Sequence, residues 1–264
     1  MPTLLLLKLT LAPLLVAGAT GVAQIWGPRA GGLLMGLPLT TGPIFLFLTV
    51  EHGPHFGADA TVGILYGLVG LVAFAVVYSA AAARTPWMAS LAVATAAFFV
   101  VPLCARNLGN NIFIAGSTAW FAQALALSLM RKANQQIPSS PQRWWNIWAR
   151  MLAVAVLTLA ITTAAAKLGP ALSGIFGTFP IAISVIVAFT HWQSGPQAVA
   201  LMLRGCVVSW ISFTNCFVVV GLTLEALGVA AALGLGVLVG VLTSVVILLS
   251  EVVWNMIPPH DLRF

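Results

Sequence analysis

The chain has 264 residues, of which 61% are hydrophobic and only 6% are charged. Soluble proteins carry about 25% charged residues, so this composition excludes a soluble globular protein and predicts an integral membrane protein. The three cysteines have no metal-ligand or redox spacing and imply no disulfide framework, and the net charge of +6 suits cytoplasmic loops and anionic lipid head groups better than nucleic acid.

Apolar stretches long enough to cross a bilayer, about 20 residues each, follow one another along the chain. The first could be a cleaved secretory signal, but it lacks a basic start and has an equivalent in the second half, so we expect a retained span. The pattern predicts an all-α polytopic membrane protein of about nine transmembrane helices. They are residues 4–26, 31–50, 57–82, 86–105, 112–130, 147–167, 171–191, 197–222 and 228–252.

One clearly polar connector, residues 131–146, separates the fifth and sixth predicted spans. Short loops rich in Lys and Arg lie on the cytoplasmic side, so we expect this connector to be cytoplasmic. Alternation of the spans then places the N-terminus outside and the C-terminus in the cytoplasm. Tryptophans near the predicted span ends fit the aromatic belts of a membrane protein.

A pattern of glycines and prolines recurs in the two halves, because residues 27–63 align without a gap on residues 169–205. Gly and Pro mark places where a helix bends, stops or approaches another backbone closely. A repeated pattern of them therefore predicts a repeated backbone shape. The matches are Gly27-Pro28 with Gly169-Pro170, Gly32 with Gly174, Pro38 with Pro180, Gly53-Pro54 with Gly195-Pro196, and Gly63 with Gly205.

The order of the spans gives this repeat a direction. Spans one to four correspond to spans six to nine and the fifth has no partner, so equivalent helices cross the membrane in opposite directions. Inverted-topology repeats of this kind are common among secondary transporters. The expected units are repeat one at 1–105, a linker span and cytoplasmic connector at 106–146, repeat two at 147–255, and a cytoplasmic tail at 256–264.

Prolines inside the second and seventh spans predict a pair of broken helices. Each Pro removes a backbone hydrogen bond, and in lipid the freed groups must be satisfied by protein, water or ligand. Paired breaks point to a binding site near the membrane midplane, with kinks needed only for packing as the alternative. Including polar residues of the eighth span, the predicted substrate-binding residues are Pro38, Thr40, Thr41, Thr178, Pro180, Ser184, Arg204 and Asn215.

Arg204 is the clearest charge inside a predicted span. A charge within the membrane is costly and indicates function, so Arg204 could pair with an anionic substrate group. It could equally extend its side chain toward the cytoplasmic head groups, and the sequence leaves both roles open.

Small residues four apart along the ninth span form a stripe that predicts close helix packing. The partner of this stripe is either another helix of the bundle or a second copy in a homo-oligomer. The small-residue stripe comprises Gly228, Ala232, Gly236, Gly240 and Ser244.

Titratable side chains cluster where the second span meets the third, with a histidine at the equivalent place in the second half. Such groups can couple proton movement to transport, although most charges at loop ends are simply solvated. The proton-coupling candidates are Glu51, His52, His55 and His191. The first three also resemble a metal-ligand spacing with Asp59, but we predict no metal site and no cofactor. Motifs for nucleotide binding, nucleophilic catalysis or zinc proteases are lacking, so we do not expect an enzyme.

Several short features distinguish the second half: Arg150, Gly169, the Phe179-Pro180 pair and the Ala-Leu-Met-Leu-Arg-Gly run at 200–205. With these features, the chain resembles in each half the GlpM-like family of small four-span bacterial inner-membrane proteins. The first half departs from the pattern, with Leu37-Pro38 for Phe-Pro and Val62 at the place of the later base. The resemblance implies a multi-pass protein of the bacterial inner membrane, built as a fused duplication, and implies no particular activity.

These features together favour a secondary transporter that moves a small anionic solute by alternating access. Positive half-helix N-termini and Arg204 would attract an anion, and none of the five acidic residues lies at a span centre to neutralise a cation. The alternatives are a protein that handles lipids or polyprenyl phosphates, an inverted-repeat channel, and an intramembrane enzyme or assembly factor. The expected partners are membrane lipids and the solute, and we expect no binding to nucleic acid.

Overall fold

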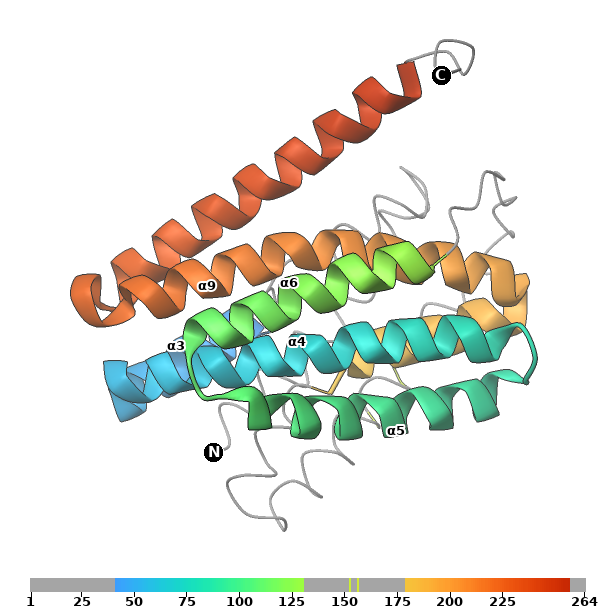
Figure 1. The fold of residues 1–264 in the computed structure, drawn as a ribbon, viewed down its shortest axis with the longest axis horizontal. Coiled ribbons are helices and arrows are strands. Elements are labelled where there is room, and N and C mark those ends of the chain that lie inside the picture. Colours follow the sequence, from blue (N-terminus) through green and yellow to red (C-terminus); the bar gives the residue numbers. More distant parts are fainter. Residues whose placement is uncertain (1–40, 131–151, 153–155, 157–178, 257–264) are drawn as a thin grey trace.

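The computed structural model describes residues 41–130, 152, 156 and 179–256, and within these ranges every regular element is helical (Figure 1). The elements are α3 (Thr41–His52), α4 (Pro54–Ala82), α5 (Trp87–Ala105), the short 3-10 helix η1 (Arg106–Leu108), α6 (Ile112–Leu129) and α9 (Ile181–Met256). The predicted all-α class is confirmed for this part of the chain. The predicted span 4–26 lies outside the described residues, and so does 147–167 apart from residues 152 and 156.

Four of the described helices are long and apolar enough to cross a membrane. They are α4, α5 extended through η1, α6, and the part of α9 between Ile183 and Ser250. The predicted spans 57–82, 86–105 and 112–130 agree with α4, α5 and α6 to within a few residues. The chain therefore has the helices of a membrane-embedded protein.

Helix α9 consists of three helical segments joined at two glycines. Gly195 (φ 81°, ψ 179°) and Gly228 (φ 76°, ψ 170°) leave the helical region, and both have a positive φ that suits glycine. They separate residues 181–194, 196–227 and 229–256, which we call the first, middle and last segments. Figure 1 shows the last segment turning back over the middle one.

Helix α4 lies at the centre of the bundle and contacts α3, α5, α6 and α9. It packs closely against α5 at Gly70, where an added Cβ would lie 2.8 Å from the carbonyl oxygen of Phe98. Because glycine has no side chain, the two helix backbones come into direct contact there. Such close packing fixes the position of α5, whose outer face carries exposed apolar residues such as Met88 and Val93.

Helix α4 and the middle segment of α9 pack side by side in opposite directions. Near the start of α4, Thr61 faces Gly221, which lies toward the end of the middle segment. Near the end of α4, Tyr78 contacts His191, just before the middle segment begins. These two antiparallel helices correspond to the predicted third and eighth spans, which the repeat aligns with each other (Figure 1).

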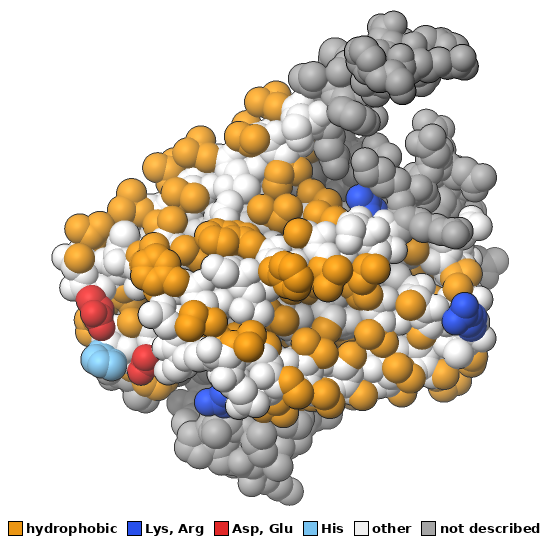
Figure 2. All heavy atoms as spheres, viewed as in Figure 1, with side chains coloured by type: hydrophobic (Ala, Val, Ile, Leu, Met, Phe, Trp, Pro, Cys, Tyr) orange, Lys and Arg blue, Asp and Glu red, His pale blue; other side chains and the backbone are white. Residues whose placement is uncertain are grey.

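The turns of the bundle gather at two ends. The first end holds the α3–α4 turn, the α5–α6 turn and the Gly228 bend, and the second end holds the α4–α5 turn, the end of α6 and the Gly195 bend (Figure 1). The exposed residues Asp59 and Glu225 lie at the first end, and Arg84 lies at the second. Figure 2 shows acidic and histidine side chains together at one end of the face in view. The turn at 83–86 and the end of α6, both predicted to lie on the cytoplasmic side, are at the second end, and the orientation of this end toward the cytoplasm stays a prediction.

The last segment of α9 packs its small-residue stripe against the middle segment. An added Cβ on Gly236 would lie 2.8 Å from the Cys216 carbonyl oxygen, and one on Gly240 would lie 3.3 Å from that of Ser212. The Ser244 hydroxyl donates a hydrogen bond to the Ser212 hydroxyl, 2.9 Å away. Of the two predicted uses of the stripe, packing within the bundle is therefore observed for Gly236, Gly240 and Ser244, whereas Gly228 lies at the bend and outside the helical stripe. A homo-oligomer through this stripe stays a prediction.

Candidate functional site

At the position of the break predicted at Pro180 the structure has a helix start, and the residues before Phe179 lie outside the described part of the chain. Phe179 and Pro180 are not helical, and α9 begins directly after them at Ile181. The Ser184 amide donates to the Pro180 carbonyl oxygen, 2.8 Å away, and so closes the first helical turn. The Ser184 hydroxyl is buried and donates to the Ile181 carbonyl oxygen at 2.8 Å.

Aromatic packing places this break at half the depth of the bundle. The ring of Phe179 lies 5.4 Å from that of Phe98 and 5.7 Å from that of Phe99, measured between centroids, and it stacks on Phe99. Phe98 in turn contacts Gly70, in the middle of α4. A helix that begins at this depth directs the positive end of its dipole into the interior of the protein.

The equivalent break at Pro38 lies outside the described residues, as do Thr40 and Thr178. Thr41 is the first described residue of α3 and is partly exposed. The Phe45 ring of α3 packs edge-to-face on Phe217 of the middle segment, with the centroids 5.6 Å apart. Helix α3 therefore packs on the middle segment of α9, whereas Phe179 packs on α5.

Asn215 joins three helical segments by hydrogen bonds. Its Oδ1 accepts from Trp120 Nε1 of α6 at 2.9 Å, and its Nδ2 donates to Thr243 Oγ1 of the last segment at 3.1 Å. Both polar groups of the amide are thus used between helices. The predicted site residues therefore fall into two groups, since Pro180 follows Phe179, which packs on α5, whereas Asn215 adjoins α6 and the last segment.

Arg204 holds the end of α6. Its Nη1 donates to the carbonyl oxygens of Leu127, at 2.7 Å, and of Met130. The last carbonyls of a helix have no partner within the helix, and a cation there also interacts favourably with the helix dipole. The guanidinium is therefore fixed at the second end of the bundle.

Gln123 of α6 is a buried polar residue that the sequence analysis did not single out. Its Nε2 donates to Thr214 Oγ1 at 2.7 Å and to the Trp210 carbonyl oxygen at 3.1 Å. The side chain is only 1% exposed, and its Oε1 has no hydrogen-bond partner in the described part of the chain. An unpaired buried acceptor is unusual in native proteins. The sequence did not indicate this residue, because a single Gln in an apolar helix forms no recognisable pattern.

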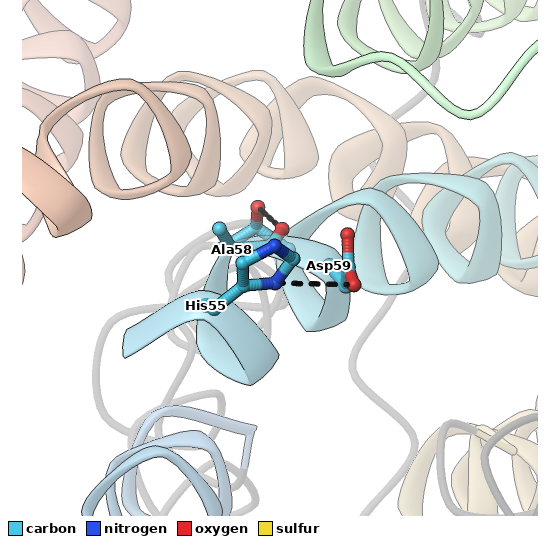
Figure 3. Close-up of polar contacts among 4 residues, drawn as sticks. His55, Ala58 and Asp59 are labelled. Carbon is cyan, nitrogen blue, oxygen red and sulfur yellow. Dashed lines mark hydrogen bonds and ion pairs between the residues drawn. The ribbon is translucent and has the colours of Figure 1, made fainter. Parts of the chain in front are cut away.

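The titratable candidates lie at opposite ends of the bundle. At the first end, His55 Nδ1 lies 3.7 Å from Asp59 Oδ2 (Figure 3). The two residues are one helical turn apart on α4, and both side chains are largely exposed. At the second end, His191 Nδ1 lies 3.3 Å from the hydroxyl of the buried Tyr78, and their rings meet edge-to-face. The side chains of Glu51 and His52 are not described. Among the described residues, no three His, Cys, Asp or Glu side chains are grouped closely enough to hold a metal ion.

Comparisons with protein-family models, curated proteins and solved structures find no match for this chain. The resemblance to the GlpM-like family therefore stays a prediction.

Replacing Gln123 by Met is expected to leave the thermal stability of the detergent-solubilised protein unchanged or to raise it. Met has a similar volume and removes the unpaired Oε1, whereas Thr214 Oγ1 still donates to the Trp210 carbonyl oxygen at 3.0 Å. Removing a buried polar group without orphaning its partners is nearly neutral or stabilising. Gln123→Ala is the control, because the cavity it leaves should lower stability. Equal losses of thermal stability in Gln123→Met and Gln123→Ala would contradict the unpaired state of Gln123 Oε1.

Proposed function

We propose that the chain is a secondary transporter that moves a small anionic solute by alternating access between two inverted halves. In this proposal the solute binds at half depth, beside the helix start that follows Phe179 and Pro180. The observation that carries the proposal is the start of α9 at half depth, because such transporters bind their cargo where a helix is interrupted near the bilayer midplane.

The antiparallel packing of α4 with the middle segment of α9 supports the inverted arrangement. These helices are the aligned third and eighth spans, and inverted repeats require such equivalent helices to run in opposite directions. The bends before them also match, since Gly53 has φ 91° and ψ 167° and Gly195 has φ 81° and ψ 179°. Each bend precedes a proline in the first turn of the next helix.

The charge distribution supports an anion rather than a cation as cargo. Of the described acidic side chains, Asp59 and Glu225 are exposed at the first end of the bundle, far from the break. A cation at half depth would therefore meet neither of these two carboxylates. An anion would interact favourably with the N-terminal end of α9.

A second candidate function is the handling of lipids or polyprenyl phosphates. It is favoured by Arg204, whose guanidinium lies at the second end of the bundle, on α6, rather than at the Pro180 break. That position suits a phosphate at the membrane surface better than a solute at the midplane.

Purified protein reconstituted into liposomes provides the test. Screening labelled small carboxylates, phosphate and sulfate is expected to find one solute whose uptake saturates and shows counterflow. Flux that never saturates would indicate a channel instead. Movement of fluorescent phospholipids between leaflets without uptake of any solute would favour the second candidate.

Pro180→Ala is expected to reduce the uptake rate at least about tenfold, equivalent to about 1.4 kcal/mol, with little change in the amount of folded protein. Ala would allow the helix to extend through the break and so remove the interior helix start. Pro102→Ala is the matched control, because Pro102 lies inside α5 without ending that helix. Equal losses of uptake and folded protein would reduce the Pro180 break to a packing feature.

A further inference from the structure

The fixed guanidinium of Arg204 keeps unused hydrogen-bonding capacity. Arginine has five N–H donors, and only Nη1 of Arg204 is bonded to α6. In the described part of the chain, Nε and Nη2 have no protein partner, and the one ion pair there joins His55 to Asp59 at the opposite end. The described carboxylates, Asp59 and Glu225, lie at the first end of the bundle, so neither neutralises this fixed positive charge.

The Arg204 guanidinium lies close to the depth of the lipid head groups. Arg204 lies within the middle segment, and side chains in an α-helix tilt toward its N-terminus, which here is the Gly195 bend at the second end. The carbonyls that it binds belong to Leu127 and Met130, at the last turn of α6. The guanidinium therefore lies near the boundary between hydrocarbon and head groups, where arginines commonly extend their charge.

An apolar face continues from Arg204 toward the middle of the membrane. Val208 and Ile211 are partly exposed on the same face of the middle segment, and Asn215 follows at half depth. We call Arg204, Val208, Ile211 and Asn215 the Arg204 face. Gly205 borders it, and an added Cβ there would meet no atom within 4 Å. On the opposite side of this helix, Cys206, Ser209 and Phe213 are buried.

The length of the Arg204 face matches one lipid leaflet. From Arg204 to Asn215 the helix rises about 16 Å at about 1.5 Å per residue, and one leaflet contributes about 15 Å of hydrocarbon. The amide of Asn215 is already bonded to Trp120 and Thr243, so hydrogen bonds between helices close the inner end of the face. A charge at one end of an apolar face of this length has the chemistry of a phospholipid site.

We propose that the Arg204 face binds one anionic phospholipid from the leaflet at the second end of the bundle. The lipid phosphate accepts hydrogen bonds from Arg204 Nε and Nη2, and an acyl chain lies along Val208 and Ile211. A free anion would gain nothing from these two apolar side chains, which is why the occupant is a lipid. The site does not depend on transport, and failure of the uptake test would leave it unaffected.

The test measures the melting temperature of delipidated full-length protein in detergent after adding phosphatidylglycerol, phosphatidylcholine or inorganic phosphate. Phosphatidylglycerol is expected to raise the melting temperature by several degrees, because a ligand at about 100 times its Kd stabilises by about 2.7 kcal/mol. Phosphatidylcholine should raise it less, and inorganic phosphate should have no effect. An equal rise with inorganic phosphate would overturn the lipid assignment.

Arg204→Gln is expected to abolish the rise caused by phosphatidylglycerol, whereas Arg84→Gln keeps it, since Arg84 is exposed at the same end and off this face. Because Arg204→Gln also releases the end of α6, Gly205→Leu serves as a second variant that fills the open space beside Arg204 and keeps its charge. It is expected to weaken phosphatidylglycerol binding at least tenfold. Gly234→Leu is its matched control, as an added Cβ on that glycine also meets no atom within 4 Å. A wild-type response in Gly205→Leu would overturn the proposal, even where Arg204→Gln fails to fold.

Discussion

Replacing Gly70 by Ala is expected to destabilise the detergent-solubilised protein by roughly 1–3 kcal/mol, the usual cost of overpacking. The new Cβ would lie 2.8 Å from the Phe98 carbonyl oxygen and 3.1 Å from Cγ of Pro102. A backbone oxygen cannot rotate away as a flexible side chain can, so α4 and α5 would have to separate. The measurement is the midpoint of thermal or denaturant-induced unfolding.

Gly63→Ala on the same helix is the matched control. An added Cβ on Gly63 meets no atom within 4 Å, so the substitution should gain about 0.5–1 kcal/mol from lower backbone entropy in the unfolded chain. Both variants add one methyl group to α4, and they differ only in whether that methyl group would contact α5. Similar effects at both positions would show that α4 and α5 do not meet at Gly70.

Much of the helical framework could be predicted because its signals are local. An apolar run of membrane-spanning length indicates a helix without reference to its neighbours, and the limits of α4, α5 and α6 follow from such runs. The bends at Gly53 and Gly195 could also be predicted from local sequence. A Gly-Pro pair combines a residue that tolerates positive φ with one suited to the first turn of the next helix.

The partners of the polar side chains could not be predicted in the same way. Arg204 binds the carbonyl oxygens of Leu127 and Met130, and every residue carries a carbonyl group, so no sequence pattern marks those two. Tyr78 and His191 meet across 113 residues of chain, and Gln123 is a single amide in an apolar helix. These contacts depend on which helix faces lie together, which the length and apolarity of a span do not determine.

Gly195→Ala is expected to destabilise the Gly195 bend by about 1–3 kcal/mol, the cost of holding a residue other than glycine in this backbone conformation. Gly195 has φ 81° and ψ 179°, and an added Cβ meets no atom within 4 Å, so the effect comes from the backbone alone. In the proposed transporter this bend joins the half-depth helix to the middle segment. The variant should therefore lose uptake in liposomes as well as stability.

Gly53→Ala tests whether the two halves work as equivalent units. Gly53 shares the conformation and the open surroundings of Gly195, so an inverted repeat requires losses of similar size at both bends. Gly63 and Gly205 supply a matched control pair, because they are also aligned by the repeat, lie within helices and have open space beside them. Alanine at either control should preserve uptake. A large loss at one bend with none at the other would mean that the bends have different roles, and alternating access by exchange of the two halves would then have to be abandoned.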